Sequence, residues 1–341
     1  MDIKKEGYYY TLTNAKGASV TLSEIGAGIV SIIVPDKDGK LADVVLGYEK
    51  PESYFGDGPF LGKCPGRFAN RIALGKFTLN GKEYTLPINC GPNHLHGGPE
   101  GFSNKVWDSR TVGDAVEFMY FSEDGEQGYP GNLKVVAHYE WSEDNELKLS
   151  FTAECDADTF VNLTNHVYFN LNGEGNGNIL GHMLKLNCSE YLPTDDTQIP
   201  LGDSEPVAGT PMDFTTPKAV GTDVDNFEYE QLKNGNGYDH NWVLSTDCDD
   251  TVPAAVIYCP ETGIRLTEYT DEPGVQMYCG NFLDGTVTGK GGIVYQQRVG
   301  IVFESQHYPD SPNKPEWPSV VLRPGETYTS HCVFAFDTIN E

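Results

Sequence analysis

The sequence predicts an all-β protein, built as one large antiparallel β-sandwich with few short helices. Runs of β-branched and aromatic residues recur from end to end, and polar and apolar positions alternate within them. The 341 residues include 38 glycines and 21 prolines, which suits a chain with many turns. No heptad pattern, solenoid repeat or low-complexity linker interrupts the chain, so a single domain over residues 1–341 is expected.

Hairpin patterns give the order of the strands. The clearest hairpin spans residues 76–86, where Asn80-Gly81 supplies the positive φ angles of a two-residue turn between alternating segments. An earlier hairpin is expected over residues 8–13 and 18–22. Further strands are expected at residues 116–121, 133–141, 146–155, 254–258, 264–269 and 327–336. Helices of about two turns are expected only at residues 51–54 and 226–233.

The segment from residue 193 to residue 237 is the longest stretch that resembles a loop. It is rich in Asp, Thr, Pro and Gly, which favour turns over regular structure. Loops of this length inside a compact domain are often functional. We therefore expect this segment to contribute to a site.

The charge and the cysteine content of the chain indicate which partners it can bind and in which cellular compartment it is expected. The formal net charge of −27 repels phosphate backbones, so a neutral small ligand is favoured and no nucleic acid is expected. No stretch is long and apolar enough to span a membrane. Residues 1–7 lead straight into a strand-like run without a signal segment. The eight cysteines form no Cys-x-x-Cys pair, so we expect reduced thiols and a cytoplasmic protein.

Two apolar runs, each expected to form a strand, carry one ionisable side chain apiece. Residues 163–171 place His166 among apolar, aromatic and amide residues, and residues 302–307 place Glu304 in a similar setting. Burying such a group is costly unless it is paired, so we interpret His166 and Glu304 as an acid/base pair. The alternatives are a core histidine bonded to a backbone carbonyl, and a structural ion pair between Glu304 and Arg71.

Other polar segments have side chains that suit a sugar. Residues 66–72 place Arg67 and Arg71 around Asn70, a set that can bind vicinal hydroxyls or form surface salt bridges. Asp239 lies among aromatic residues, and a carboxylate beside ring faces fits hydroxyl groups and an apolar C–H face. Gln276 adds an amide on an expected strand.

Two histidines alternate in the segment 93–98. On extended backbone His94 and His96 point to opposite sides, so at most one of them is expected to face a given site. The following Gly97-Gly98 permits a sharp turn or a close approach of a ligand. The His-x-His pattern has no clear third ligand, so no metal is expected.

Six segments of the chain together resemble the aldose 1-epimerase (galactose mutarotase) family, and the resemblance covers nearly the whole chain. They are residues 66–72, 93–98, 122–131, 163–171, 237–242 and 302–307. It implies a galactose mutarotase-like supersandwich and an isomerase that interconverts the α and β anomers of free aldohexoses such as galactose and glucose. By resemblance, Glu304 is the general base and His166 the general acid. The same resemblance assigns sugar binding to Asn70, Arg71, His96, Asp239 and Gln276. No cofactor is expected, because ring opening, bond rotation and reclosure exchange no net proton, electron or group. A monomer and a homodimer both stay open.

The acid/base pair requires an ionised Glu304 and a protonated His166. Their ordinary pKa values are about 4.3 and about 6.5, so an unperturbed histidine would be mostly neutral at pH 7. We therefore expect a nearby carboxylate to raise the pKa of His166, and partial burial to raise the pKa of Glu304. A bell-shaped pH profile should follow.

Three other functions compete with this interpretation. An epimerase for phosphorylated hexoses would need a basic cluster beyond Arg71, to which Arg67 could contribute. A glycoside hydrolase would use Asp239 and Glu304 as carboxylates separated by ~5–5.5 or ~6.5–9.5 Å. A sugar-binding regulator or lectin could keep Arg71 and Asp239, but it has no need for the pair of Glu304 and His166.

Overall fold

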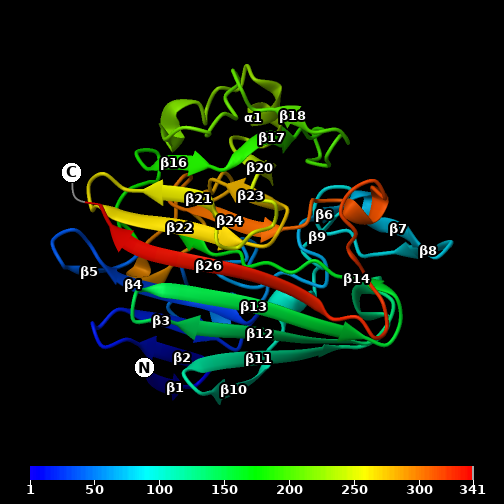
Figure 1. Cartoon of the computed structure of the whole chain (residues 1–341), viewed down its shortest axis with the longest axis horizontal. Helices are drawn as coiled ribbons and strands as arrows, with labels where there is room; N and C mark the ends of the chain where they lie inside the picture. The colour runs from blue at the N-terminus through cyan, green and yellow to red at the C-terminus, as the bar shows by residue number, and fades with distance from the viewer. Residues whose placement is uncertain (340–341) are drawn as a thin grey trace.

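The computed structural model describes residues 1–339, so the last two residues of the predicted domain 1–341 lie outside the described residues (Figure 1). Antiparallel strands make up most of the regular secondary structure, as the sequence predicted. The largest sheet has nine strands, in the order β10 (Asp108–Val112), β11 (Ala115–Ser122), β12 (Leu133–Trp141), β13 (Glu146–Cys155), β26 (Tyr328–Thr338), β22 (Ile264–Thr270), β21 (Pro253–Tyr258), β16 (Met183–Leu186) and β19 (Lys218–Ala219).

Two further sheets meet edge to edge and form the opposing layer. One contains β1 (Asp2–Glu6), β2 (Tyr9–Thr13), β3 (Ser19–Ser23), β4 (Gly28–Pro35) and β5 (Leu41–Asp43) in sequence order. The other runs in the order β15 (Tyr168–Phe169), β24 (Ile301–Gln306), β23 (Gly274–Tyr278), β20 (Asp239–Leu244), β17 (Cys188–Leu192) and β18 (Glu205–Pro206). The amide of Leu46 donates to the carbonyl of Tyr168 at 3.0 Å, and the amide of Asn170 donates to Val44 at 2.9 Å. These bonds join the two sheets.

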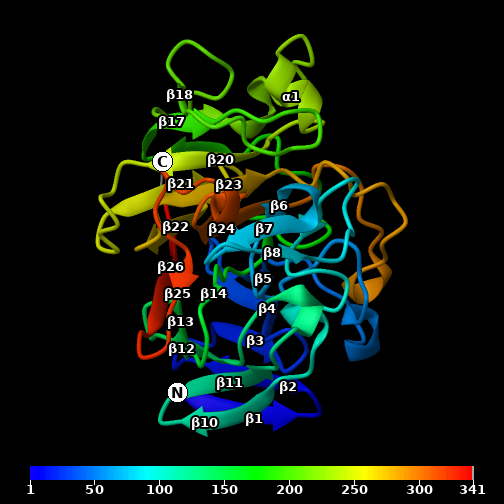
Figure 2. The ribbon, with the colours of Figure 1, turned by 90° about the vertical axis from the view of Figure 1, so that its right-hand side faces the viewer.

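Aromatic side chains fill the space between the layers. Tyr10 of β2 meets Phe118 of β11 edge to face, with ring centroids 5.9 Å apart, and Phe169 of β15 meets Phe334 of β26 at 5.1 Å. All four rings are buried, and burying a side chain of this size contributes about 1.5–3 kcal/mol. Figure 2 shows the layers from the side, with β12, β13 and β26 on the left and β3, β4 and β5 to their right. The predicted sandwich is confirmed.

Three two-stranded ribbons complete the strands, namely β6 (Arg71–Ile72) with β9 (His94–Leu95), β7 (Lys76–Leu79) with β8 (Lys82–Thr85), and β14 (Thr159–Phe160) with β25 (Val321–Leu322). The ribbon of β7 and β8 is the hairpin predicted over residues 76–86. Asn80 and Gly81 at its turn have φ angles of 52° and 77°, as that turn requires.

Helical structure is scarce, as predicted. The α-helix α1 (Glu230–Asn234) covers only one turn of the segment expected at residues 226–233, and its N-cap Tyr229 provides no side-chain hydrogen bond. The segment expected at 51–54 is a 3₁₀ turn, η1 (Pro51–Tyr54). The other 3₁₀ turns are η2 (Ala73–Gly75), η3 (Phe102–Asn104), η4 (Glu126–Gly128), η5 (Val220–Thr222), η6 (Lys290–Gly292) and η7 (Ser311–Asn313). Among the residues described, no helix combines the length and apolar character that a bilayer crossing demands.

The segment around His166 differs from the prediction. Residues 163–171 read as one strand in the sequence, but regular pairing is limited to β15 at Tyr168–Phe169. His166 lies before that strand and pairs irregularly with a loop. Its amide donates to the carbonyl of Lys63 at 2.8 Å, and its carbonyl accepts from the amide of Gly62 at 3.0 Å. Asn165 adds a bond from its side-chain amide to the carbonyl of Gly62 at 2.8 Å. These hydrogen bonds therefore fix the backbone at His166, although it belongs to no regular β-strand.

Candidate active site

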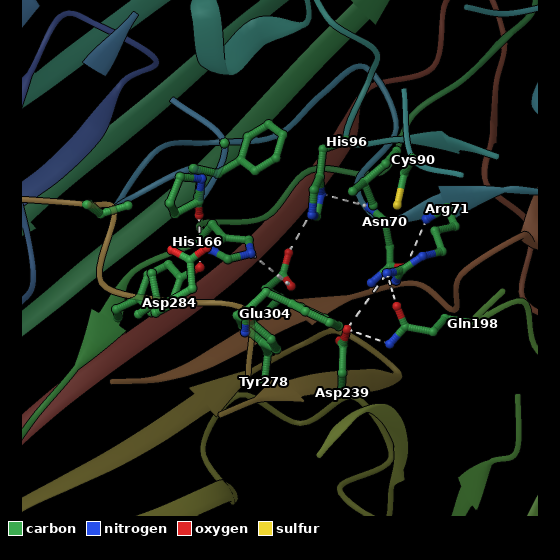
Figure 3. A pocket seen from close by; sticks show the side chains of 18 of the residues that line it. Asn70, Arg71, Cys90, His96, His166, Gln198, Asp239, Tyr278, Asp284 and Glu304 are labelled. Atoms are coloured by element: carbon green, nitrogen blue, oxygen red, sulfur yellow. Dashed lines mark hydrogen bonds and ion pairs between the residues drawn. The ribbon is translucent and has the colours of Figure 1, made fainter. Parts of the chain in front are cut away.

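A cavity of about 590 Å³ opens above strands β20, β23 and β24 of the six-stranded sheet (Figure 3). Loops and short ribbons wall it from the other sides, and aromatic and polar side chains alternate around it. Its lining is Tyr48, Gly58, Pro59, Phe60, Asn70, Arg71, Cys90, Leu95, His96, His166, Tyr168, Gln198, Asp239, Tyr278, Phe282, Leu283, Asp284, Thr286, Val287 and Glu304. A cavity of this size and mixed polarity fits a small molecule.

Glu304 lies at the centre of the cavity floor. It comes from β24, which pairs with β15 at Ile301 and Val302, and Glu304 itself is held by β23 on the other edge. Its side chain is 2% exposed. The Oε1 atom lies 3.7 Å from Nε2 of His166, whereas Oε2 has no hydrogen-bond partner within residues 1–339. This carboxyl group is therefore free to exchange a proton with a bound molecule.

Two buried histidines flank Glu304, and each is held differently. The ring of His166 packs against the rings of Tyr168 and Phe60, with centroid distances of 5.1 and 6.0 Å. The Nδ1 atom of His96 accepts a hydrogen bond from the backbone amide of Asn70 at 3.1 Å. Since Nδ1 is an acceptor, the neutral ring of His96 carries its proton on Nε2. His96 is thus a donor, and its Nδ1 lies 3.9 Å from Glu304 without bonding to it.

Burial dominates the protonation of the pair. It raises the pKa of Glu304 well above its ordinary value, with a further upward effect from Asp239 and an opposing one from Arg71. Burial lowers the pKa of His166 from 6.5 to about 4. The expected rise for His166 is therefore wrong, because desolvation of the imidazolium outweighs the attraction of Asp239. The expected rise for Glu304 is confirmed. Both shifts favour the neutral forms of the pair, a protonated Glu304 beside a neutral His166.

A second polar group stands beside the pair and is built around Asp239 of β20. Its Oδ1 accepts a hydrogen bond from Nε2 of Gln276 at 2.7 Å, and its Oδ2 accepts one from Nε2 of Gln198 at 2.7 Å. The guanidinium of Arg71 lies 3.7 Å from the same Oδ2 and donates to Oε1 of Gln198. Donors and acceptors thus lie side by side, an arrangement that suits hydroxyl groups.

Six of the seven predicted site residues line the cavity, namely Asn70, Arg71, His96, His166, Asp239 and Glu304. Gln276 is not part of the wall. It lies opposite Glu304 in the register of β23 and β24, and it reaches the site through its bond to Asp239. The considered ion pair between Glu304 and Arg71 does not form within residues 1–339, where the carboxylate within 4 Å of Arg71 belongs to Asp239.

Two neighbours of the site residues face away from the cavity. Arg67 is buried and donates to the carbonyls of Pro130 and Gly131 at 2.7 and 2.9 Å, so it is a structural residue. His94 lies between the carbonyl of Pro87 and the hydroxyl of Tyr129, at 2.7 and 2.8 Å. The prediction that only one histidine of the His-x-His segment faces the site is confirmed.

Sequence reasoning missed several lining residues. Gln198 lies in the long loop that was expected to be functional, but no pattern singled out this amide. Tyr278 lies two residues beyond Gln276 on β23, and Phe282 stacks on it with a centroid distance of 6.2 Å. Phe60 sits over His96 at 4.8 Å. Isolated aromatic residues in loops carry no spacing signal, because the fold alone brings them together.

His96, His166 and Glu304 are also the residues that a metal could use, since one ligand atom from each lies within 4.8 Å of the others. The hydrogen bond from Asn70 uses the lone pair on Nδ1 of His96, and Nε2 then carries the proton. His96 therefore has no lone pair left for a metal. The three residues suit proton transfer and hydrogen bonding better than coordination.

Known proteins share this chain's sequence and fold. The family described as aldose 1-epimerase matches residues 8–335. The galactose mutarotase of Mus musculus is 43% identical over 93% of this chain and 91% of its own length. The aldose 1-epimerase of Escherichia coli K12 is 40% identical over 96% of this chain and 94% of its own. A crystal structure of an aldose epimerase homologue from C. elegans superposes with a TM-score of 0.87 at 30% identity, covering 97% of this chain and 99% of that one. On this sequence similarity and shared fold, the chain belongs to the aldose 1-epimerase family of isomerases.

Proposed function

We propose that this enzyme interconverts the α and β anomers of free aldohexoses such as galactose and glucose, with Glu304 as general base and His166 as general acid. The observation that carries the proposal is the 3.7 Å separation between Oε1 of Glu304 and Nε2 of His166 on the wall of one cavity. The two oxygens that change protonation, the anomeric hydroxyl and the ring oxygen, are bonded to the same carbon. An acid and a base that serve both must therefore lie this close together.

The chemistry moves protons and breaks one C–O bond. Glu304 takes the proton of the anomeric hydroxyl while His166 gives one to the ring oxygen, and the ring opens to the aldehyde. Rotation about the C1–C2 bond turns the other face of the carbonyl toward the C5 hydroxyl. Closure then reverses both transfers, so Glu304 ends as the acid and His166 as the base. Each transfer by a positioned group contributes typically ~10²–10⁴-fold.

The burial of the pair supports this cycle. With one proton shared between two poorly solvated groups, moving it from Glu304 to His166 needs no exchange with bulk water. Sugar hydroxyls that donate to Glu304 stabilise its ionised form and thereby favour the protonated imidazole. The pair carries the same total charge before and after this transfer, so no charge leaves the cavity.

The remaining polar residues support a neutral sugar as substrate. We propose that Asn70, Arg71, His96, Asp239 and Gln276 hold it, with Gln276 acting through Asp239. Arg71 is the one cationic side chain among the described residues that line the cavity, and Asp239, Asp284 and Glu304 line it as well. Three carboxylates and one guanidinium disfavour a phosphate group, which weakens the alternative of a phosphorylated hexose. Tyr278 and Phe282 offer ring faces for the C–H face of the sugar.

Polarimetry of freshly dissolved α-D-galactose tests the proposal. The wild type should reach the equilibrium rotation much faster than buffer, and Glu304→Gln should lose about 10²–10⁴-fold in kcat. Glu316→Gln, an exposed carboxylate change outside the cavity, is the matched control and should keep full activity. A wild type that binds galactose but equilibrates it no faster than buffer would indicate a sugar-binding protein without turnover.

We also propose a cytoplasmic enzyme that acts as a monomer or a homodimer, with residues 1–341 forming one domain. Eight free thiols, among them the buried Cys64, Cys188 and Cys279, are compatible with a reducing compartment. One core cluster draws its residues from both layers, which supports a single folding unit. Sedimentation velocity would separate monomer from dimer.

A further inference from the structure

Gln198 joins the two charged groups at one end of the cavity. Arg71 donates a hydrogen bond to its Oε1, and its Nε2 donates to Oδ2 of Asp239 at 2.7 Å. Figure 3 shows this amide between the guanidinium and the carboxylate. The side chain is only partly buried and lines the cavity, so it can also contact a bound molecule.

The loop that carries Gln198 holds the residue in a fixed position. Gln198 has a φ of 64°, and its backbone N–H donates to the backbone carbonyl of Asp195 at 3.0 Å. Oδ1 of Asp195 accepts from the amides of Thr197 and Ile199 at 2.8 and 3.0 Å, which closes a tight turn. Asn93 ties this turn to the rest of the site, because its side-chain amide donates to the carbonyl of Thr197 at 3.2 Å. The amide of Gln198 is thus presented by a bonded turn.

The amide keeps unused hydrogen-bonding capacity on the cavity side. A glutamine side chain has two N–H donors and a carbonyl oxygen with two lone pairs. The bonds to Asp239 and Arg71 use one N–H and one lone pair, which leaves one of each. A hydroxyl group both donates and accepts, so it complements the remaining pair. Arg71 can only donate and Asp239 can only accept, and neither offers both functions alone.

The position of Gln198 relative to the acid/base pair limits which hydroxyl it can meet. In Figure 3, His166 and Gln198 lie on opposite sides of Glu304. If the proposed function holds, the anomeric carbon and the ring oxygen approach Glu304 and His166. In a pyranose ring C4 is opposite C1 and C3 is opposite the ring oxygen, so these carbons extend away from the pair, toward Gln198.

We propose that Gln198 binds the hydroxyl on C3 or C4 of the aldohexose and so determines which epimers the enzyme accepts. This inference rests on the proposed function. A single hydrogen bond between neutral groups contributes modestly, so Gln198→Ala should lower kcat/KM for galactose about 3- to 10-fold. The loss should appear as a higher KM with an unchanged kcat, because the hydroxyl is held equally in the ground state and in the transition state.

Deoxy sugars test the assignment directly. Wild type and Gln198→Ala are compared on galactose and on its 2-, 3-, 4- and 6-deoxy derivatives by the initial rate of mutarotation. The variant should lose kcat/KM on every sugar except the 3-deoxy or the 4-deoxy one, which lacks the contacted hydroxyl. An equal loss on all five sugars would overturn the inference, since it would mean that Gln198 only positions Arg71 and Asp239. No loss on any sugar would overturn it as well.

A control in the same turn separates the amide from the loop. Asp196 is exposed and does not line the cavity, so Asp196→Ala should leave kcat/KM unchanged on every sugar. If this variant reproduces the pattern of Gln198→Ala, the loop and not the amide is responsible, and the inference fails. A wild type that is inactive on all five sugars would instead reject the proposed function. If the wild type is active and Gln198→Ala loses kcat/KM equally on all five sugars, this inference alone is rejected.

Discussion

Asn70 and His96 hold each other through two hydrogen bonds. The amide of His96 donates to the carbonyl of Asn70, and the amide of Asn70 donates to Nδ1 of His96, each at 3.1 Å. Both residues adopt positive φ angles, 63° and 52°, which bring the ring back over its partner. The ring of His96 is therefore locked with its proton on Nε2 and its second nitrogen occupied. The case against a metal depends on this arrangement and not on the missing third ligand that the sequence suggested, because His166 and Glu304 lie near His96.

Chelation should leave the enzyme active. Dialysis against EDTA is expected to change kcat by less than about twofold, since His96 provides no lone pair to complete a ligand set with His166 and Glu304. The measurement is polarimetry before and after dialysis, with metal content followed by mass spectrometry. Loss of activity on chelation and its recovery on adding Zn²⁺ would contradict the assigned tautomer.

The pH–rate profile should have an acid limb near pH 4. The pair is active while it holds one proton, and a second proton enters when His166 is protonated, at a pKa of about 4. The rate should therefore fall as the pH drops through about 4. It should also fall as the pH rises through the raised pKa of Glu304, where the remaining proton is lost. An acid limb near 6.5, the ordinary value for histidine, would show that His166 is well solvated in the working enzyme.

Acid should destabilise the fold through its buried neutral histidines. His182 is fully buried, its Nε2 accepts from the amide of Leu171 at 2.9 Å, and burial lowers its pKa from 6.5 to about 4. A depressed histidine pKa gives stability that is present above pH 6.5 and lost as the pH falls toward 4. Between these two pH values, each such histidine lowers the free energy of unfolding by up to about 1.4 kcal/mol for each pH unit of acidification.

Replacing His182 isolates this contribution. His182→Gln should be less stable than the wild type at pH 7.5, but its free energy of unfolding should fall less between pH 6.5 and pH 4. Urea denaturation at several pH values measures both effects. His331→Gln, a change at an exposed histidine, is the control and should keep the wild-type pH dependence. An unchanged slope for His182→Gln would mean that His182 is protonated in the folded state.

Gly97 should tolerate no side chain. Its φ is 80°, and a Cβ atom there would overlap the carbonyl oxygen of Gly66. Gly97→Ala should destabilise the protein by about 2–4 kcal/mol and disturb the neighbouring His96, so that kcat falls as well. Gly81→Ala is the matched control, with a similar φ of 77° but nothing within 4 Å of the added atom. Gly81→Ala should lower the free energy of unfolding by only about 1 kcal/mol and leave kcat unchanged. Equal effects of both variants would contradict the contact at Gly97.

The sequence predicted the features that depend on local pattern. The alternation in β12 and β13 and the turn at Asn80-Gly81 need no information from distant residues, and both were found where expected. Glu304 could be placed on a strand for the same reason. His166 could not, because its backbone bonds to Gly62 and Lys63, which are about a hundred positions away. A period-two pattern cannot reveal such pairing.

The electrostatics of the site were also beyond local reasoning. The pKa of His166 is set by its desolvation, and Phe60 and Tyr168 are among the side chains that pack around it, one of them far away in the sequence. The bridge formed by Gln198 likewise joins three separate segments. Motif order indicated which residues meet, but only packing determines how much water reaches them.

Glu304 and Gln198 occupy parts of the fold that differ in how freely they can change. Glu304 lies in β24, where neighbouring strands on both sides constrain the register, so a shift of this strand would disturb the whole layer. Gln198 is a partly buried residue of the turn between β17 and β18, outside the strands, where substitutions are tolerated better than in a paired strand. Descendants of this chain can therefore change the sugars they accept while the reaction itself is conserved. For an engineer, grafting turns at residues 193–202 offers a route to new specificities that leaves the proton-transfer apparatus intact.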